Sequence, residues 1–479
     1  MDKIFVKHTR LEVPNYELGS CELLERSLSM WNKVTHKMEA KGFMYNIETN
    51  TLYLPRALDV NFVARQLNRQ VVMDYSPDEP KKANMRLMVE PRSDIQKKAL
   101  SFLFGVGDFA YTKGRSQLSL NLGTGDGKTY VTIAALTYYK EVTMIITHIN
   151  RLEDQWVGSL KKFTDIRDSE ICEIDGSKDI KKLMEIDKLN YKVYFVNHRT
   201  LHSYGNKHGW DAVGKLFKKL QIGVKVYDEA HLEFDNILRT DFSTNTKKTI
   251  YLTATFQRTG VENKVFNLCF KNIAKYGIET RNEKRKHIRY MGIIYNSKPS
   301  MEARSEMKNI HGFDKNKYCD YLVECKKFYE VLFDVMHRFD KLEGKQLILV
   351  SKIDAVEWVA KYIHDEFPEK TVGMYHSKIP MDEKMASLDK DIIVSTPKSM
   401  GTGVDVPGLR ICIMTEPYSS EVTADQTSGR LREYAPDLYS FYVELVDKGF
   451  MKVYKMYKER NKVFKKKCDK VLEIPFDEK

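Results

Sequence analysis

Leu122-Gly123-Thr124-Gly125-Asp126-Gly127-Lys128-Thr129 is the stretch that decides the fold of this 479-residue chain. The apolar and hydroxyl-rich run 117–120 precedes it, and the run 130–136 after it reads as a helix. A strand, a glycine loop and a helix form a cradle in which backbone N–H groups and the helix N-terminus bind phosphate. In such a cradle Lys128 reaches the β- and γ-phosphates and Thr129 holds Mg²⁺. Taken alone, glycines beside a Lys-Thr pair also occur in ordinary turns.

Two adjacent acids downstream supply what this loop lacks. The short apolar run 224–227 leads directly into Asp228-Glu229-Ala230-His231. Beside a bound triphosphate, one carboxylate holds the Mg²⁺ shell and the other orients and deprotonates the attacking water. A strand that ends in two acids after such a loop therefore favours a nucleotide site over a solvated Asp-Glu pair.

Strand-like and helix-like segments alternate through two long regions of the chain. Further buried-type strands of the first region are expected at 142–147, 191–196 and 249–252, and those of the second at 346–350, 372–376, 391–396 and 410–414. Alternation of this kind indicates doubly wound parallel sheets. The second region has no phosphate loop of its own. Several of the strands end in polar loops, and ligands sit at the carboxyl ends of strands in open α/β sheets.

The two ends of the chain differ from these regions. Residues 1–85 predict a small α+β domain, with a hairpin at 41–54, helical spacing at 21–40 and 61–72, and a polar linker at 74–82. Its Arg56, Arg65 and Arg69 either contact a nucleic-acid backbone or form a solvated surface. The tail 451–479 begins with a lysine-rich helix that either lies on nucleic acid or packs on the second sheet. We thus expect four parts, 1–85, 86–280, 281–450 and 451–479.

The composition limits the classes of protein that fit. Hydrophobic residues make up 42% of the chain and charged residues 30%, as in soluble globular proteins. No apolar run is long enough to span a membrane, and the N-terminus has no signal-peptide core, so we expect a cytoplasmic protein. The seven cysteines are scattered without a Cys-x-x-Cys pair, which argues against zinc. The net charge of +12 favours a polyanionic partner, although it also fits simple solubility.

The motifs occur in a characteristic order. Gln96 comes first, followed by the glycine loop, the stretch 147–156, Asp-Glu-Ala-His, Thr253-Ala254-Thr255, Thr402-Gly403-Val404-Asp405 and Gln426-Thr427-Ser428-Gly429-Arg430. This set resembles superfamily 2 helicases and translocases over residues 88–450. Within that superfamily the size and the N-terminal module are most similar to phage-encoded recombination and repair helicases of the UvsW kind. The resemblance implies an α/β protein with two RecA-like domains in tandem after a small N-terminal α+β domain.

The resemblance also implies roles for individual residues. ATP and Mg²⁺ would lie between the two RecA-like domains, and the nucleotide would be held by Gln96 (adenine), Gly123, Thr124, Gly125, Asp126, Gly127, Lys128, Thr129, Gly403 and Asp405. Catalysis would fall to Lys128, Asp228 with Thr129 on Mg²⁺, Glu229 on the water, Gln426, and Arg430 with Arg432 as an arginine finger. Such a finger is worth about 10³–10⁵ in rate. His231, Thr253 and Thr255 would couple hydrolysis to movement.

The strand-end loops of both domains would face a nucleic-acid backbone. They contain Asn150, Arg151, Asn197, His198, Arg199, Ser351, Lys352, Thr396 and Lys398. Phosphate contacts of this type carry no sequence information. The chain departs from the family pattern in three places: Leu122 replaces the first glycine, Ile95 replaces an aromatic residue before Gln96, and Arg432 follows Arg430 by two residues instead of three. The shifted spacing puts more of the finger role on Arg430.

From these observations we predict an ATP-dependent DNA helicase or translocase that unwinds or remodels branched or duplex DNA as a monomer. Recombination, repair, branch migration and replication-fork processing are the expected settings. An RNA helicase is the first alternative, because backbone-facing loops serve either polymer. A motor that pumps duplex in a restriction or remodelling complex without separating strands is the second. A catalytically silent scaffold that binds nucleic acid is the third.

Overall fold

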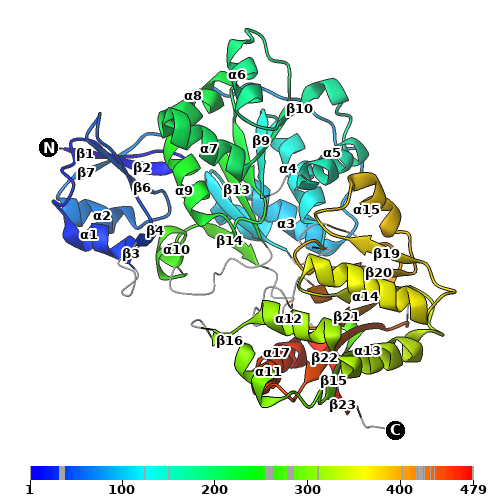
Figure 1. The fold of residues 1–479 in the computed structure, drawn as a ribbon. Coiled ribbons are helices and arrows are strands. Elements are labelled where there is room, and N and C mark those ends of the chain that lie inside the picture. Colours follow the sequence, from blue (N-terminus) through cyan, green and yellow to red (C-terminus); the bar gives the residue numbers. More distant parts are fainter. Residues whose placement is uncertain are drawn as a thin grey trace. The chain divides into compact units, whose positions relative to one another are not determined.

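A computed structural model describes most of the chain. The described residues are 2–31, 38–122, 126–148, 151–253, 263–277, 285–309, 312–400, 404, 406–416, 418, 424, 427–431, 433–435 and 437–476. They form two compact units, Met1–Ile278 and Glu279–Lys479. Figure 1 shows the elements of each unit in sequence colours. Among the described residues no helix is both long and apolar enough to cross a membrane.

The first unit begins with a five-stranded mixed sheet. Its strand order is β5(Met44–Asn46)-β6(Thr51–Pro55)-β2(Arg10–Val13)-β1(Lys3–Val6)-β7(Gln70–Met73), with α2(Val60–Leu67) before β7. Antiparallel pairing of β5 with β6 confirms the predicted hairpin. The helix predicted over 21–40 is only α1(Glu22–Ser27), and β3(Ser29–Trp31) follows and pairs with β4(Met38–Lys41). Strand pairing thus overrides the helical spacing after Ser27.

The rest of the first unit is a seven-stranded sheet in which every pairing is parallel. The order is β10(Ile171–Ile174)-β11(Val193–Asn197)-β9(Thr143–Thr147)-β12(Val224–Tyr227)-β13(Lys248–Thr253)-β8(Gln117–Asn121)-β14(Ala274–Gly277). The helices are α3(Asp94–Phe104), α4(Lys128–Tyr139), α5(Arg151–Phe163), α6(Ser177–Glu185), α7(His198–His208), α8(Trp210–Lys219), α9(Phe234–Ser243) and α10(Asn263–Cys269). The predicted doubly wound sheet is confirmed.

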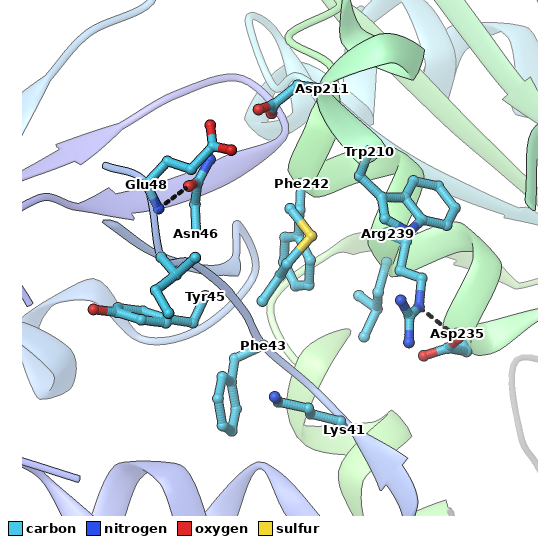
Figure 2. A pocket seen from close by; sticks show the side chains of 13 residues that line it. Lys41, Phe43, Tyr45, Asn46, Glu48, Trp210, Asp211, Asp235, Arg239 and Phe242 are labelled. Carbon is cyan, nitrogen blue, oxygen red and sulfur yellow. Dashed lines mark hydrogen bonds and ion pairs between the residues drawn. The ribbon is translucent and has the colours of Figure 1, made fainter. Parts of the chain in front are cut away.

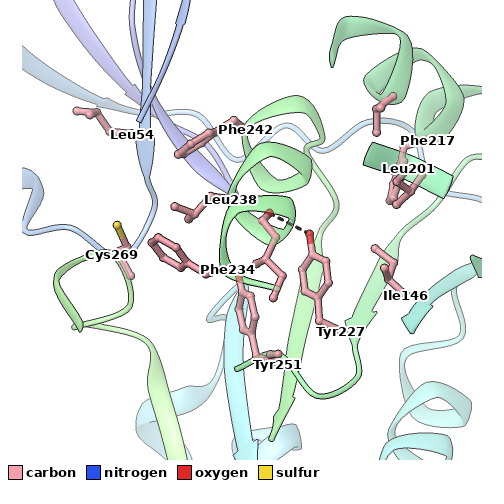
Figure 3. Close-up of a cluster of buried hydrophobic side chains, with 14 of the residues drawn as sticks. Leu54, Ile146, Leu201, Phe217, Tyr227, Phe234, Leu238, Phe242, Tyr251 and Cys269 are labelled. Carbon is pink, nitrogen blue, oxygen red and sulfur yellow. Dashed lines mark hydrogen bonds between the residues drawn. The ribbon is translucent and has the colours of Figure 1, made fainter. Parts of the chain in front are cut away.

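Each face of this sheet has its own core, as alternation along the strands requires. In β9, Ile145 belongs to the core that includes α3, α4 and α5, whereas Met144 and Ile146 belong to the core on the other face. The second of these cores continues into the N-terminal sheet. Figure 3 shows Leu54 of β6 together with Leu238 and Phe242 of α9, which belong to the same core. The N-terminal sheet therefore shares one hydrophobic core with the parallel sheet.

The second unit contains another seven-stranded sheet with only parallel pairings. Its order is β19(Val372–Tyr375)-β20(Ile392–Ser395)-β18(Lys345–Leu349)-β21(Leu409–Met414)-β22(Ser440–Asp447)-β15(Arg285–Tyr295)-β23(Cys468–Pro475). Its helices include α11(Met301–Glu306), α12(Lys315–Glu324), α13(Lys326–Phe339), α14(Ile353–Glu366) and α15(Met381–Ser387), and β16(Lys308–Asn309) pairs only with β17(Gly312–Phe313).

The basic tail is built into this second unit. It forms α17(Met451–Lys467) and then β23, which pairs in parallel with β15. The ring of Phe464 stacks on Tyr290 of β15, with ring centroids 4.1 Å apart. A Cβ at Gly292 would lie 2.4 Å from the Tyr457 hydroxyl, so α17 packs directly on the strand. The sequence predicts that the tail either lies on nucleic acid or packs on the second sheet. The structure shows the second arrangement, in which the aromatic face of α17 packs on the sheet.

Candidate nucleotide site

The phosphate loop leads into α4 as the sequence predicts. Lys128 is the first residue of α4, and Gly127 before it has φ of +88°. A Cβ at Gly127 would lie 2.4 Å from Nε2 of Gln96. The glycine is therefore required both by the left-handed backbone and by the close approach of Gln96. Thr129 follows Lys128 in the first turn of the helix, whereas Gly123, Thr124 and Gly125 lie outside the described residues.

Gln96 is buried and bridges two backbone segments. Its Oε1 accepts a hydrogen bond from the Arg92 N–H at 2.9 Å, and its Nε2 donates to the Asp126 carbonyl at 3.4 Å. The side chain therefore ties the start of α3 to the phosphate loop. Its predicted contact with adenine stays a prediction.

The two acids stand at the end of β12 beside the lysine. Nζ of Lys128 lies 3.6 Å from Oε1 of Glu229. Oδ2 of Asp228 accepts a hydrogen bond from the Trp156 indole N–H at 3.0 Å. Glu229 has φ of +49°, which is uncommon for a residue with a side chain and is found in functional turns. The loop after β8 and the acids after β12 thus meet at one edge of the sheet.

The charges of this cluster do not balance without a further cation. Loss of solvation and then the neighbouring Glu229 raise the pKa of Asp228, while Lys128 opposes the shift. Two carboxylates face one ammonium group. No group of three or more acidic, histidine or cysteine ligands occurs among the described residues. The donor set fits Mg²⁺, which protein sites hold by one or two carboxylates together with substrate phosphates.

A second contact joins the acids to the neighbouring strand. Nδ1 of His231 lies 3.0 Å from Oγ1 of Thr253, the last residue of β13, and 3.3 Å from Oε2 of Glu229. His231, Thr253 and Glu229 are all buried. This chain of polar contacts runs from the acid pair to the end of β13. Thr255 lies outside the described residues.

The predicted nucleic-acid residues of the first unit have different environments. Arg199 is exposed, whereas Asn197 accepts the Thr200 N–H at 2.7 Å and so caps α7. His198 is buried and stacks on Tyr227, with centroids 5.7 Å apart. Burial lowers the pKa of His198 to about 4, so this imidazole is neutral at pH 7. Of these three side chains, Arg199 is the one that reaches solvent.

Two other predicted nucleic-acid residues of the first unit are described only in part or not at all. Asn150 is not described, and Arg151 opens α5 without a described side chain. Next to them, Nδ1 of His148 lies 2.7 Å from Oε1 of Glu233. That contact links the loop after β9 to the segment after the acids. The sequence pattern gave no signal for it, nor for Trp156 as the partner of Asp228.

In the second unit the predicted contact residues also divide into exposed and engaged side chains. Lys398 and Ser351 are exposed. Lys352 forms an ion pair with Asp320. Thr396 is buried, and its hydroxyl accepts the Ser399 N–H at 2.9 Å.

The arginine motif is described only in part. Arg430 is half-buried and its guanidinium donates to the Val404 carbonyl. Gly403, Asp405, Gln426 and Arg432 lie outside the described residues.

Comparison with known proteins agrees with this geometry. Residues 86–258 match the family described as type III restriction enzyme, res subunit. A protein of Acanthamoeba polyphaga mimivirus, named as an ATP-dependent RNA helicase, is 25% identical over 72% of this chain and 63% of its own length. The DNA 3'-5' helicase XPB of Kineococcus radiotolerans is 28% identical over 31% of this chain and 25% of its own length. The chain thus spans less than two thirds of these relatives.

Solved structures agree on the fold. The structure of S. cerevisiae Dbp5 bound to RNA and ADP BeF3 is 15% identical, with a TM-score of 0.53 over 80% of this chain and 90% of that chain. This match and the two parallel sheets confirm the predicted RecA-like tandem fold. T4 UvsW, also 15% identical, aligns over 99% of this chain and 100% of that chain with a TM-score of 0.39. A score that low supports no argument.

Proposed function

We propose that this chain, a relative of superfamily 2 helicases, is a nucleic-acid motor driven by ATP hydrolysis. The observation that carries the proposal is the cluster of Lys128, Glu229 and Asp228 at the carboxyl edge of the first sheet, with Lys128 Nζ 3.6 Å from Glu229 Oε1. A structural ion pair does not require a second, adjacent carboxylate whose pKa is raised. Perturbed acids in a phosphate-loop setting favour a catalytic role.

Each residue of the cluster has a role that its contacts support. Lys128 neutralises charge on the β- and γ-phosphates, and the backbone at Asp126 and Gly127 binds phosphate oxygens. Asp228, oriented by the Trp156 indole, would hold Mg²⁺ together with Thr129. When bound, Mg²⁺ supplies charge that stabilises the phosphoryl transition state. Glu229 orients the attacking water and accepts its proton.

Residues of other segments complete the proposed reaction. Arg430 stabilises charge on the γ-phosphate, with Arg432 as a second candidate and Gln426 as the group that positions water. Gln96 reads adenine, and Gly403 and Asp405 contact the nucleotide. His231, Thr253 and Thr255 couple hydrolysis at the acid pair to domain movement. The 3.0 Å contact between His231 and Thr253 supports this last role.

For the polymer we propose DNA, branched or duplex, with recombination and repair as the setting. The net charge of +12 supports a polyanion, and the relative XPB is named as a DNA helicase. The proposed backbone-facing loops contain Asn150, Arg151, Asn197, His198, Arg199, Ser351, Lys352, Thr396 and Lys398. Of the described side chains among them, the exposed cations Arg199 and Lys398 are the best placed to contact phosphates.

Two other functions are each favoured by a specific observation. The relative that matches over the longer stretch is named as an RNA helicase, which favours RNA as the polymer. The match of residues 86–258 to the res subunit of type III restriction enzymes favours a motor that pumps duplex without separating strands.

One experiment tests the proposal and separates these functions. ATP turnover is measured with single-stranded DNA, duplex, fork, four-way junction and RNA, at two salt concentrations. We expect the largest stimulation with forked or branched DNA and a smaller one at higher salt, because phosphate contacts release counterions. Stimulation by RNA alone would favour the RNA helicase. Duplex stimulation with triplex displacement but no strand separation would favour the pumping motor. Turnover that no polymer stimulates would contradict a nucleic-acid motor.

A further inference from the structure

A small pocket lies at the opposite end of β8 from the phosphate loop. Arg115 and Ser116 directly precede β8, Lys248 opens β13, and Asn272 precedes β14. Because these three parallel strands are neighbours in the sheet, their amino ends meet at one edge. β8 has five residues, so on the order of 17 Å separates this edge from the phosphate loop at about 3.3 Å per residue.

The N-terminal sheet closes the pocket. Arg56 follows β6, and the Ser116 hydroxyl donates to the His8 carbonyl at 2.7 Å. The cavity has a volume of about 140 Å³, and its lining includes Arg56, Arg115, Ser116, Gln117 and Asn272. Pockets for drug-sized ligands measure about 300–1,000 Å³. The size therefore suits one small chemical group.

The positive charge of this pocket is not compensated. Arg56 donates to the Tyr75 hydroxyl at 3.4 Å, and Arg115 donates to the Tyr111 and Asn272 carbonyls. Among the described residues neither arginine has a carboxylate in ion-pair contact, and Nε of Arg56 is buried without a hydrogen-bond partner. Behind them, Lys248 Nζ donates to the Arg115 carbonyl. Three cations therefore meet only neutral groups.

Two neighbouring basic groups have lowered pKa values, with burial as the main cause and nearby cations as a further one. Burial, and then the charge of Lys247, lowers the pKa of Lys248 to about 8. Burial also lowers the pKa of His8, with further contributions from Arg56 and Lys248. The carboxylate of Glu141 lies 2.7 Å from Lys247 Nζ and 3.2 Å from Lys82 Nζ, so it is already shared between two lysines.

A larger groove of the same unit shows the contrast. It has a volume of about 420 Å³ and lies between the hairpin and α8–α9. Figure 2 shows that Lys41 and Arg239 there are accompanied by Glu48, Asp211 and Asp235. Arg239 Nε donates to Asp235 Oδ2 at 2.7 Å. Arg239 thus has a carboxylate partner within that groove, whereas the described lining of the smaller pocket contains no carboxylate.

We propose that the pocket of Arg56 and Arg115 binds a phosphate group, at a site separate from the nucleotide site. Arginine guanidinium groups match phosphate oxygens in charge and geometry, and an anion here would satisfy the uncompensated cations. The phosphate belongs either to a small phosphorylated molecule or to a nucleic-acid backbone. The proposal goes beyond the ATPase and does not depend on it.

The test uses the full chain with saturating ADP, so that the nucleotide site is filled. One arm measures binding of inorganic phosphate by calorimetry, and the other measures anisotropy of labelled single-stranded DNA, duplex DNA and RNA across salt concentrations. Arg56→Gln/Arg115→Gln is compared with Arg26→Gln/Arg86→Gln, which removes the same charge from exposed sites of the same unit. Arg56→Lys/Arg115→Lys keeps the charge and reports whether a folding defect causes any loss. Circular dichroism and thermal unfolding check that all variants fold.

The two arms distinguish the sources. We expect the pocket variant to lose about tenfold or more in affinity for at least one probe, relative to the control, with the lysine variant in between. Loss for inorganic phosphate alone points to a small phosphorylated molecule. Loss for nucleic acid, with a salt slope smaller by about two, points to its backbone. If a folded pocket variant binds every probe as tightly as the control does, the proposal is wrong.

Discussion

The two parallel sheets of this protein have the same topology. Counted along the chain, the strands of the first sheet lie in the order third, fourth, second, fifth, sixth, first, seventh, and β15, β18, β19, β20, β21, β22 and β23 give the same order in the second. At the end of the fifth strand, the Asp228 N–H donates to the Ile146 carbonyl at 2.9 Å, and the Thr415 N–H donates to the Leu349 carbonyl at 3.1 Å. Glu416 therefore occupies the place of Glu229.

The two glutamates share their position and their burial but differ in their neighbours. Glu229 has Lys128 at 3.6 Å and an aspartate before it. Glu416 follows a threonine, is buried, and accepts the Ser351 N–H at 2.8 Å. Among the described residues it forms no ion pair, and burial raises its pKa. The fold thus supplies the same buried acid twice, and its neighbours decide whether that acid has a chemical role.

The neighbours differ because the first strand of each sheet leads into a different loop and helix. β8 leads through the glycine loop into α4, a helix of 12 residues that begins with Lys128. β15 leads into Asn296-Ser297-Lys298-Pro299 and then into α11, which has six residues. A helix that short with no glycine turn before it makes no phosphate cradle. One loop, and not the sheet, separates the unit that contains the proposed phosphate loop from the unit that lacks such a loop.

The largest effect that sharpens this comparison is expected at two lysines that follow the first strand of each sheet. Lys128→Ala should lower ATP turnover by about 10²–10³-fold or more, because it removes the cation that we propose faces the phosphates. Lys298→Ala, in the loop after β15, should leave turnover unchanged. Steady-state ATP hydrolysis of both variants, with circular dichroism to confirm folding, measures this. Undiminished turnover in Lys128→Ala would contradict the assignment of the site.

A smaller effect is expected at Trp156, which has a counterpart of the same residue type in the second unit. Trp156→Phe removes the indole N–H that donates to Asp228 at 3.0 Å. Loss of a group that orients a metal ligand costs about 10–100-fold in metal affinity. The Mg²⁺ concentration that gives half-maximal turnover should rise by that amount. Trp358→Phe, at an exposed position of α14, is the control and should not change it.

The smallest effect concerns the stability contributed by Glu416. Because its pKa is raised from an ordinary value near 4.5, the folded protein binds this proton more tightly than the unfolded chain. The stability from this group is full below that value and is lost as pH rises through the raised pKa. Glu416→Gln should therefore raise the Tm by about 1–4 °C at pH 7 and by less at pH 4. Calorimetry at the two pH values measures this, and an equal change at both would refute it.

The sequence was most informative where a motif fixes its own local structure. The glycine loop predicted where α4 begins, the acids predicted the end of β12, and the alternating run at 41–54 predicted the hairpin. Each of these predictions depends on residues that are adjacent in sequence, so it can be made without knowledge of the whole fold.

The failures come from strand pairing and packing that the local sequence pattern does not show. Helical spacing predicted a helix past Ser27, but pairing with residues 38–41 makes that segment a strand. His198 lies in a polar stretch, yet stacking on Tyr227 buries it. Trp156 and Asp228 are 72 positions apart and meet only because β9 and β12 are neighbours. The pairing of β3 with β4 and the order of strands in the parallel sheet decide these contacts, and sequence spacing reveals neither.

The most direct measurement of the central claim compares the two equivalent glutamates. Steady-state ATP hydrolysis, with a stimulating nucleic acid present, is measured for Glu229→Gln and Glu416→Gln beside the unchanged protein. We expect Glu229→Gln to lose about 10²–10⁴-fold in turnover, as removal of a general base does, while ADP still binds. Glu416→Gln should stay within about twofold of the unchanged protein, since nothing assigns its carboxylate a part in the reaction. Equal losses in the two variants, or none in Glu229→Gln, would contradict the claim that the first sheet alone holds the catalytic acids.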